Sequence, residues 1–497
     1  MAPGIYKTFR KVWKKNVRYD IQRGLLKEDD FTLRIDNNDQ YNYVRIENMF
    51  DDDDDLIESV LDNRIKEYRY DNFNKVGDCL SDDIKQLIDI TRDETENACY
   101  QAMEGIVHNL NTLHCLPKFE RIWVVDTLFN CNALKLITIE ELFLNFSPYR
   151  YKVLSYNKDL DIWEWKFITN CVNNGIRNTI IKTKTTKGQT VYTTDNHKFL
   201  VRDKNTDNII EAYPKEINEV LVCKNMPGVP SLPAVSLDHY HSRKKQNYLE
   251  DHIPLTPEFA ELLGYYVADG SVTSGSCLSF TVCDEALINR IVYLMKYIYG
   301  ENITYNFYYF TDSNGTRRIK DVRFNTGKVF CDCFKDICGK NAYSKKIPEI
   351  ILKNYDDSFL IEFLKAYFWC DARCSHYIEA FTVSYQLSRD ILFAIYRLGE
   401  IAYVSNKTNG YNIIIGGKAS ERIGLKSILA RECSCEYRKD NKISKNNIFA
   451  VNSSWEEIPY NDCVYDISVE DNENFMNADG ILIHNSRAGA QVECCLV

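Results

Sequence analysis

The sequence is poor in the features that mark several classes of protein. Among 497 residues there are only 11 prolines and 21 glycines, which excludes a collagen-like or low-complexity chain. No run of about 18 apolar residues occurs, and the basic residues 1–16 lack the apolar stretch of a secretory signal. We therefore expect a soluble, cytoplasmic protein. Its length predicts several domains, since one domain takes about 100 to 200 residues.

Neither charge nor cysteine dominates the composition. The net charge of -10, from 61 basic and 71 acidic residues, argues against a protein that coats nucleic acid over its whole surface, although a local basic surface remains possible. The 18 cysteines are too dilute for a disulfide scaffold, and no pair of Cys-x-x-Cys knuckles marks a zinc site. In a reducing compartment these cysteines are expected to be buried or reactive thiols.

The texture of the sequence changes along the chain. Residues 1–114 carry apolar stripes at helical spacing and are predicted to be mainly helical. Short β-rich runs separated by Gly, Asn and Asp extend from 122 to 200 and return at 463–483. Between them lies a mixed α/β region, which follows a proline-rich connection at 225–257. This order predicts one β domain interrupted by an insertion.

The insertion contains an internal repeat. Residues 262–270, LLGYYVADG, recur 102 positions later as 364–372, LKAYFWCDA. On a helix, each copy has small residues four positions apart, so that the backbones of two such helices can approach closely.

An aspartate ends each copy, and the pairing of the helices would bring Asp269 and Asp371 side by side. Two close carboxylates repel unless a cation lies between them, and hard oxygen ligands favour Mg²⁺. The repeat therefore predicts a metal-dependent phosphodiester cleavage site. An ordinary core helix pair capped by aspartates is the alternative.

The two copies resemble the dodecapeptide helices of the LAGLIDADG homing endonucleases. The resemblance implies two αββαββα halves in pseudo-two-fold symmetry, acting as a monomer, with Asp269 and Asp371 binding Mg²⁺ over the scissile phosphates of double-stranded DNA. Lys345 belongs to a basic element resembling one of this family and is a candidate for stabilising charge or positioning water. Ala372 stands where the family has glycine.

A basic hairpin is predicted around Asn314-Gly315, with aromatic residues 307–309 before the turn. A two-stranded ribbon fits the major groove of DNA, and basic side chains contact phosphates or guanine edges. The candidate DNA-binding residues are Arg317, Arg318, Lys320 and Arg323. A solvated basic hairpin is the alternative.

The end of the second β region has chemistry directed at its own backbone. The side-chain amide of Asn485 can attack its own carbonyl and cut the chain, and His484 is placed to polarise that carbonyl. Ser486 supplies a hydroxyl nucleophile directly after the cut. In the first β region, Thr194 and His197 lie on a turn after a strand, where they could distort or protonate a peptide bond.

Together these elements resemble an intein, in which a Hint β fold catalyses protein splicing. Asp466 then corresponds to the acid that coordinates the steps, and Glu473 stands where the family often has His. Two cysteines compete for the role of N-terminal nucleophile. Cys115 is favoured over Cys131 because removal of residues 115–485 joins His114 to Ser486 in a sequence that resembles class III anaerobic ribonucleoside-triphosphate reductases.

These resemblances imply a multidomain fold: an all-β Hint horseshoe interrupted by an α/β endonuclease and preceded by a mainly helical extein. The expected boundaries are 1–114 for the N-extein, 115–245 and 446–485 for the Hint domain, 246–445 for the endonuclease and 486–497 for a truncated C-extein. The expected target is an intein-less host-gene site in DNA, and splicing needs no cofactor. The flanks total 126 residues, so reductase activity is not expected.

Three alternatives stay open. The chain can be a DNA-binding remnant that has lost splicing, cleavage or both, as Ala372 and Glu473 allow. It can be a non-catalytic reductase fragment, as the short flanks allow. An autoprocessing domain of the hedgehog type shares the Hint fold, but the ending His484-Asn485-Ser486 favours ligation.

Overall fold

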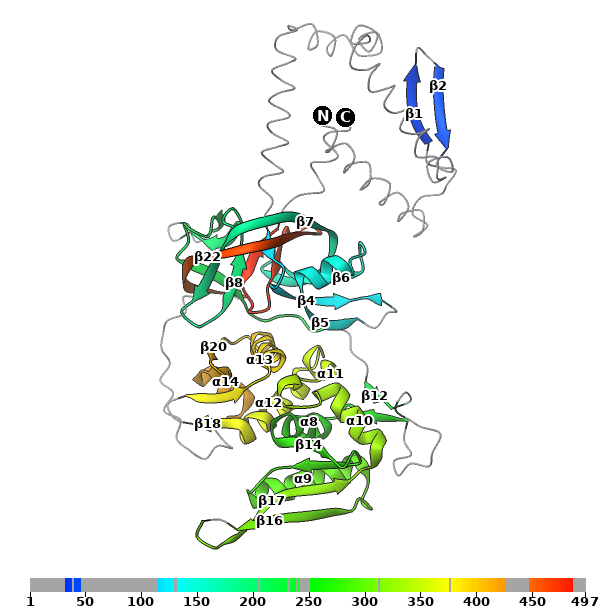
Figure 1. The fold of residues 1–497 in the computed structure, drawn as a ribbon, viewed down its shortest axis with the longest axis vertical. Coiled ribbons are helices and arrows are strands. Elements are labelled where there is room, and N and C mark those ends of the chain that lie inside the picture. Colours follow the sequence, from blue (N-terminus) through cyan, green and yellow to red (C-terminus); the bar gives the residue numbers. More distant parts are fainter. Residues whose placement is uncertain are drawn as a thin grey trace. The chain divides into compact units, whose positions relative to one another are not determined.

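The computed structural model describes two parts of the chain, which are treated separately (Figure 1). The described residues are 32–37, 40–45, 115–128, 132–203, 206, 208–229, 233–237, 240, 251–311, 313–374, 377–425 and 447–485. In the first part, β1 (Thr32–Asn37) pairs antiparallel with β2 (Gln40–Arg45). This segment is a hairpin, whereas the sequence predicted a mainly helical region. The apolar stripes behind that prediction, and also His114, Cys131 and Ser486, lie outside the described residues.

In the second part, strands from both ends of the segment 115–485 form one β domain. The strands are β3 (Leu116–Pro117), β4 (Arg121–Asp126), β5 (Ala133–Thr138), β6 (Tyr151–Asn157), β7 (Ile162–Thr185), β8 (Thr190–Thr193), β9 (Phe199–Arg202), β10 (Ile209–Ala212), β11 (Glu219–Cys223), β22 (Ile448–Val469), β23 (Asn474–Met476) and β24 (Leu482–His484). One sheet has the order β11-β22-β7-β6-β4-β5 and a second the order β10-β9-β24-β23. Helix α7 (Ile139–Leu144) follows β5 directly.

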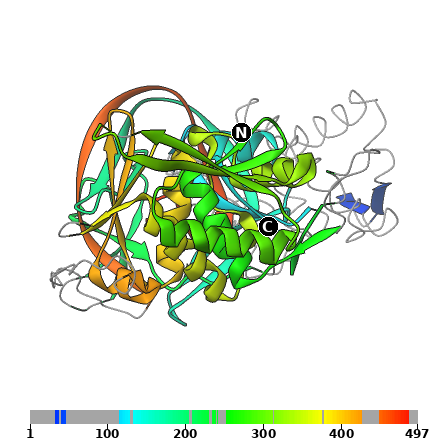
Figure 2. The ribbon, with the colours of Figure 1, turned by 90° about the horizontal axis from the view of Figure 1, so that it is seen from below.

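Two long strands join the early and late parts of the β domain. β7 and β22 have 24 and 22 residues and run antiparallel beside each other along an arc (Figure 2). β22 also pairs with β11, with Cys223 opposite Ile448. The chain therefore leaves the sheet and returns to it at adjacent positions, so an inserted domain fits there without breaking the sheet.

The inserted region repeats one arrangement of elements. The first half contains α8 (Pro257–Asp269), β14 (Gly270–Thr273), β15 (Cys277–Phe280), α9 (Glu285–Tyr299), β16 (Tyr305–Thr311), β17 (Arg317–Asn325) and α10 (Gly327–Cys338). The second half contains α12 (Asp357–Asp371), β18 (Ala372–Cys374), β19 (Ile378–Thr382), α13 (Tyr385–Arg397), β20 (Ala402–Lys407), β21 (Gly410–Ile415) and α14 (Gly417–Ile423). Their sheets have the matching orders β14-β15-β17-β16 and β18-β19-β21-β20.

Short elements connect these units. β12 (Ala234–Ser236) pairs with β13 (His252–Pro254) ahead of α8, and the 3-10 helix η3 (Ala342–Ser344) and α11 (Glu349–Leu352) separate the two halves. Among the residues that the structure describes, no helix is long and apolar enough to cross a membrane.

The two repeat helices pack directly on each other, as their small residues predict. The Thr256 hydroxyl caps α8 by accepting from the Phe259 N–H, and Pro257 begins the helix, where no backbone donor is needed. A Cβ added at Gly264 would lie 2.3 Å from the Phe363 carbonyl oxygen and 2.8 Å from Ala366 Cβ. Only glycine permits this approach, so the crossing of α8 and α12 is fixed at this point.

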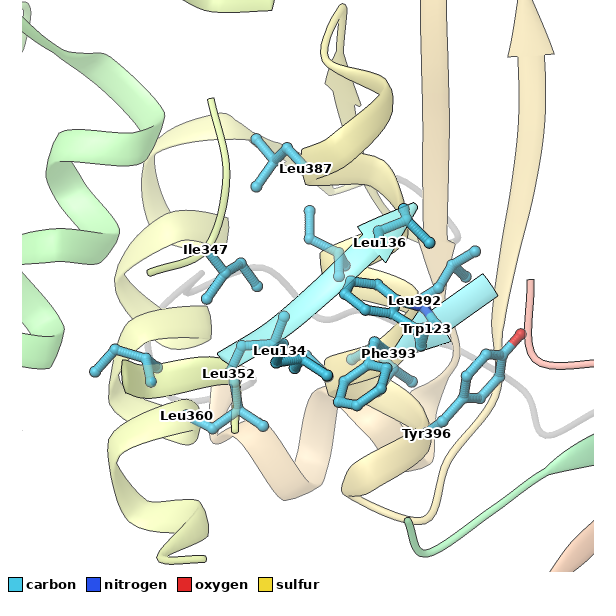
Figure 3. Close-up of a cluster of buried hydrophobic side chains, with 14 of the residues drawn as sticks. Trp123, Leu134, Leu136, Ile347, Leu352, Leu360, Leu387, Leu392, Phe393 and Tyr396 are labelled. Carbon is cyan, nitrogen blue, oxygen red and sulfur yellow. The ribbon is translucent and has the colours of Figure 1, made fainter. Parts of the chain in front are cut away.

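The β domain and the inserted region share a buried apolar cluster (Figure 3). Trp123 of β4 packs on Phe393 of α13 with 4.7 Å between ring centroids. The other labelled members are Leu134, Leu136, Ile347, Leu352, Leu360, Leu387, Leu392 and Tyr396. Burial of such side chains stabilises by about 1.5 to 3 kcal/mol each, so the contact between the two regions contributes to the stability of both.

Candidate functional sites

The first candidate site surrounds Cys115, which is fully buried directly before β3. The turn after β8 holds it, since the Thr194 N–H donates to the Cys115 carbonyl at 2.9 Å and the Cys115 N–H donates to the Thr194 hydroxyl at 3.2 Å. His197 Nδ1 lies 3.2 Å from the same carbonyl oxygen. The Thr-x-x-His turn predicted from the sequence thus contacts the peptide units of Cys115.

Asp466 lies beside Cys115 because β3 pairs with β22 through Leu116 and Tyr465. Burial, followed by the charge of the neighbouring Asp466, raises the pKa of the Cys115 thiol to about 12. The thiol is therefore protonated in the resting state. Its attack on a carbonyl requires that the proton leave during the reaction.

Asn174 was not found by the sequence reasoning. Its side-chain amide donates to Cys115 Sγ at 3.0 Å, and this bond lowers the pKa of the thiol by stabilising the thiolate. Gly175 follows with a φ of 79°, and the pairing of β7 with β22 is irregular between Cys463 and Tyr465. A Gly inside a strand-like run is the one local signal of such a bulge.

The C-terminal residues meet the same turn. β24 pairs with β9 through Ile483 and Phe199, and the His484 N–H donates to the Lys198 carbonyl at 3.2 Å. Asn485 is 1% exposed, and its N–H donates to the Glu473 carbonyl at 3.0 Å. Residues 194–199 therefore contact both Cys115 and the segment that ends at Asn485.

His484 is half-buried and faces a carboxylate, with Nε2 3.2 Å from Glu211 Oε1. Burial lowers the pKa of His484, while Glu211 and Glu473 act in the opposite direction. Glu473, which occupies the position of the family's frequent His, has a left-handed φ of 55°. It contributes a backbone acceptor to Asn485 and a nearby negative charge to His484.

The second candidate site lies where α8 and α12 end. The caps of the two helices have nearly the same backbone, with φ and ψ of -86° and 149° at Gly270 and -86° and 136° at Ala372. Because φ is negative at Ala372, the alanine adopts this terminus without strain. Alanine instead of glycine at position 372 therefore leaves the end of α12 with nearly the same backbone conformation as the end of α8.

The two aspartates interact electrostatically. Burial, followed by the charge of Asp269, raises the pKa of Asp371 to about 7. Lys345 Nζ donates to the carbonyls of Tyr266 and Gly270, and burial lowers the pKa of this lysine to about 8. Two repelling carboxylates form a pair of oxygen donors suited to a hard divalent cation. Within the described ranges no group of three or more His, Cys, Asp or Glu residues is placed so that it could hold a metal ion.

Replacing Asp371 with asparagine is expected to stabilise the protein in the absence of divalent cations. A carboxyl whose folded pKa is raised destabilises the fold progressively as pH increases from its unfolded pKa to its folded one, here from about 4 to about 7. With solvent screening at this half-buried helix end, we expect the melting temperature above pH 7 to rise by about 2 to 5 °C. Differential scanning calorimetry in a chelator at pH 8 and pH 5 checks this, and an equal gain at both values contradicts it.

The predicted basic hairpin is formed by β16 and β17. Arg317 lies over the ring of Tyr309 at 4.1 Å, and Arg323 over the ring of Tyr308 at 3.7 Å. Asp321 Oδ2 also accepts from Arg323 Nη2 at 2.9 Å, whereas Arg317, Arg318 and Lys320 are exposed. The hairpin thus presents cations stacked on aromatic faces, an arrangement suited to phosphates and bases.

A model of the intein splicing domain matches residues 128–485. Among curated proteins, the chain is similar to the replication factor C small subunit of Methanocaldococcus jannaschii, at 28% identity over 292 residues, with 56% of this chain and 14% of that protein covered. It is also similar to the DNA-directed RNA polymerase subunit Rpo1C of the same organism, at 24% identity over 245 residues, covering 44% of this chain and 26% of that protein. The chain therefore spans only a minor part of these relatives.

Solved structures share parts of the chain. The homing endonuclease I-WcaI bound to its DNA recognition sequence matches 35% of this chain and 80% of its own, at 14% identity and a TM-score of 0.26. The structure of I-DmoI in complex with DNA and Mn matches 36% of this chain and 98% of its own, at 15% identity and a TM-score of 0.26. The Pab PolII intein matches 22% of this chain and 63% of its own, at 23% identity and a TM-score of 0.19.

Proposed function

Since this chain belongs to the intein splicing domain family, we propose that residues 115–485 excise themselves and join His114 to Ser486. The observation that carries the proposal is the segment 194–199, the turn before β9 and the first residue of that strand, which contacts both Cys115 and the segment ending at Asn485. The two ends of the segment 115–485, which are far apart in the sequence, are thereby held in one buried site. Holding reacting groups together is worth about 7 to 11 kcal/mol in favourable intramolecular cases.

The first step of the proposed reaction is an acyl shift at Cys115. Its sulfur attacks the carbonyl carbon of His114, the peptide C–N bond breaks, and a thioester forms while the thiol proton is passed to the departing amine. The Thr194 hydroxyl accepts from the Cys115 N–H of this bond, and His197 holds the adjacent Cys115 carbonyl, from which it is placed to assist the departing amine. The Asn174 amide stabilises the sulfur as it gains negative charge. Asp466, beside Cys115, assists the handover of the acyl group.

The remaining steps release the intein. The Ser486 hydroxyl attacks the thioester to form an ester and returns the thiol at Cys115. The Asn485 side-chain nitrogen then attacks its own carbonyl carbon, the bond to Ser486 breaks, and a succinimide forms. His484 polarises the Asn485 carbonyl during this cyclisation. The freed Ser486 amine finally attacks the ester to give the peptide bond, so no external energy or cofactor is needed.

The inserted domain, taken as residues 246–445, is proposed to cleave double-stranded DNA at an intein-less host-gene site as a monomer. Asp269 and Asp371 would hold Mg²⁺, which when bound polarises the scissile phosphate. Lys345 lies beside Asp269 and stabilises negative charge there, and Arg317, Arg318, Lys320 and Arg323 contact the DNA. The matching ends of α8 and α12 support cleavage over a binding-only remnant. The flanks are proposed to come from a class III anaerobic reductase.

An intact-mass time course tests the splicing proposal. The full chain is purified under denaturing conditions, refolded and incubated with a reductant. We expect a 371-residue species and a 126-residue ligated product to appear together, as the junctions at Cys115 and Ser486 require. A chain that keeps its 497-residue mass, or that releases the 371-residue species without ligated flanks, contradicts the proposal.

A further inference from the structure

Arg389 belongs to the inserted domain, yet its charge is balanced by the splicing domain. It lies on α13, and its Nε is 2.6 Å from Asp479 Oδ1, with the two side chains only 6% and 4% exposed. The rings of Tyr385 and Tyr411 cover its guanidinium at 4.6 Å and 5.5 Å. Such a buried ion pair holds its partners in fixed positions, because separating them would leave uncompensated buried charges.

Asp479 is part of the turn that leads into the C-terminal splice residues. Its Oδ2 accepts from the Thr190 N–H at 2.8 Å, and its backbone carbonyl accepts from the Tyr396 hydroxyl at 2.9 Å. Tyr396 also lies on α13, at the edge of the apolar cluster with its hydroxyl pointing away from it (Figure 3). The inserted helix therefore holds both the side chain and the backbone of Asp479.

The rest of the turn is equally constrained. Asn477 Oδ1 accepts from the N–H groups of Asp479 and Ile481, at 3.1 Å and 2.9 Å, and closes the turn. Gly480 has a φ of 87°, and a Cβ there would lie 2.5 Å from the Tyr396 ring. Because α13 packs this closely against the turn, a shift of the helix moves the chain that runs through β24 to Asn485.

The negative charge of the buried Asp479 is compensated by Arg389. The other acid at this turn is Glu120, which accepts from Asn477 Nδ2 at 2.9 Å. Burial raises the pKa of Glu120 to about 8, so Glu120 is mostly protonated at neutral pH. Burial also raises the pKa of Asp479, and the charge of Arg389 opposes that rise. Without Arg389, Asp479 would take up a proton or move toward water, and in either case the turn loses the ion pair that joins it to α13.

We propose that Arg389 is a positioning residue for the C-terminal half of splicing, fixing the turn at 477–480 so that Asn485 is held for cyclisation. The inserted domain thereby becomes a structural part of the splicing site in addition to its proposed action on DNA. This inference rests on the proposed splicing function, but it concerns only the second cleavage.

The test measures the two cleavages separately. In a Cys115→Ala background, only cyclisation at Asn485 is followed, and in an Asn485→Ala background, only thiol-induced cleavage at the Cys115 thioester. We expect Arg389→Gln to slow the cleavage at Asn485 about 10- to 100-fold and to leave the thioester cleavage within about twofold, as a small displacement of one reacting group predicts. Arg389→Lys, which keeps the charge, should recover part of the lost rate.

Arg397→Gln is the matched control. Arg397 is also on α13 and buried, but its guanidinium bonds to Asp357 at 2.8 Å and to the Leu352 carbonyl at 2.7 Å, both within the inserted domain. We expect it to leave the ratio of the two cleavage rates unchanged. Equal losses at both junctions, or the same change of ratio in both variants, overturn the inference.

If Arg389→Gln does not fold, the double variant Arg389→Met/Asp479→Asn removes both buried charges and is expected to restore folding, which its melting temperature checks. It should still be slow only at Asn485, and normal cyclisation in this variant overturns the inference. When the parent chain splices and Arg389→Gln splices equally fast, only this inference fails. When the parent chain shows neither cleavage, the proposed function itself fails.

Discussion

Replacement of Asn485 by alanine is expected to abolish release of the intein while leaving the thioester at Cys115 to form. Alanine has no side-chain nitrogen to attack the Asn485 carbonyl, so the bond to residue 486 can break only by ordinary hydrolysis. The loss of an intramolecular nucleophile of this kind corresponds to a rate decrease of at least about 10⁵-fold. The branched ester or the free N-terminal flank should accumulate in place of ligated product.

Intact mass with and without brief treatment with neutral hydroxylamine distinguishes these products, because under these mild conditions hydroxylamine cleaves esters and thioesters much faster than peptide bonds. Cys115→Ala is the complementary variant, since it removes the thioester and retains cyclisation at Asn485. The two variants should therefore fail at opposite junctions. Ligated flanks from Asn485→Ala, or an unchanged product pattern as expected of an inert reductase fragment, would refute the proposed mechanism.

Much of the fold could be predicted because its signals are local or repeated. The stripes of small residues in 262–270 and 364–372 predict close helix packing, and the contact of Gly264 with the Phe363 carbonyl confirms it. The β runs on either side of the insertion predicted one interrupted β domain, and the pairing of β11 and β7 with β22 confirms that these runs share a sheet. In both cases, the type and spacing of neighbouring residues are enough to indicate the helix packing or the strands.

The missed residues act through contacts that no local pattern records. Asn174 is 59 positions from Cys115, and Arg389 is 90 positions from Asp479. On an amphipathic helix, Arg389 looks like an ordinary surface charge, and its burial results from docking against another domain. The hairpin at 32–45 was missed for a different reason, since the apolar stripes that suggested helices lie elsewhere in residues 1–114.

Asp269→Asn is expected to abolish DNA cleavage and to leave splicing at the parent rate. Asparagine keeps the size of the side chain but removes one of the two charges that would hold the cation. It also removes the charge that helps raise the pKa of Asp371. Loss of a metal-dependent site of this kind should lower cleavage about 10³-fold or more, since the cation is asked to supply several kcal/mol of charge stabilisation.

Cleavage is measured on a plasmid that carries the uninterrupted host sequence, with Mg²⁺, and binding to the same DNA is measured in a chelator. Binding should persist in Asp269→Asn because the stacked arginines of β16 and β17 are unaltered. Asp332→Asn is the control, as it removes an acid from an ion pair with Lys335 on α10.

Retained cleavage in Asp269→Asn would place the catalytic site elsewhere in the chain. A parent chain that binds the DNA without cutting it would support the remnant interpretation. A loss of splicing along with cleavage would show that the end of α8 is coupled to the Hint domain. The expected separation instead confines that coupling to α13, where Arg389 and Tyr396 reach the turn before β24. The inserted domain would then act on DNA through Asp269 and Asp371, and it would position the C-terminal splicing residues through α13.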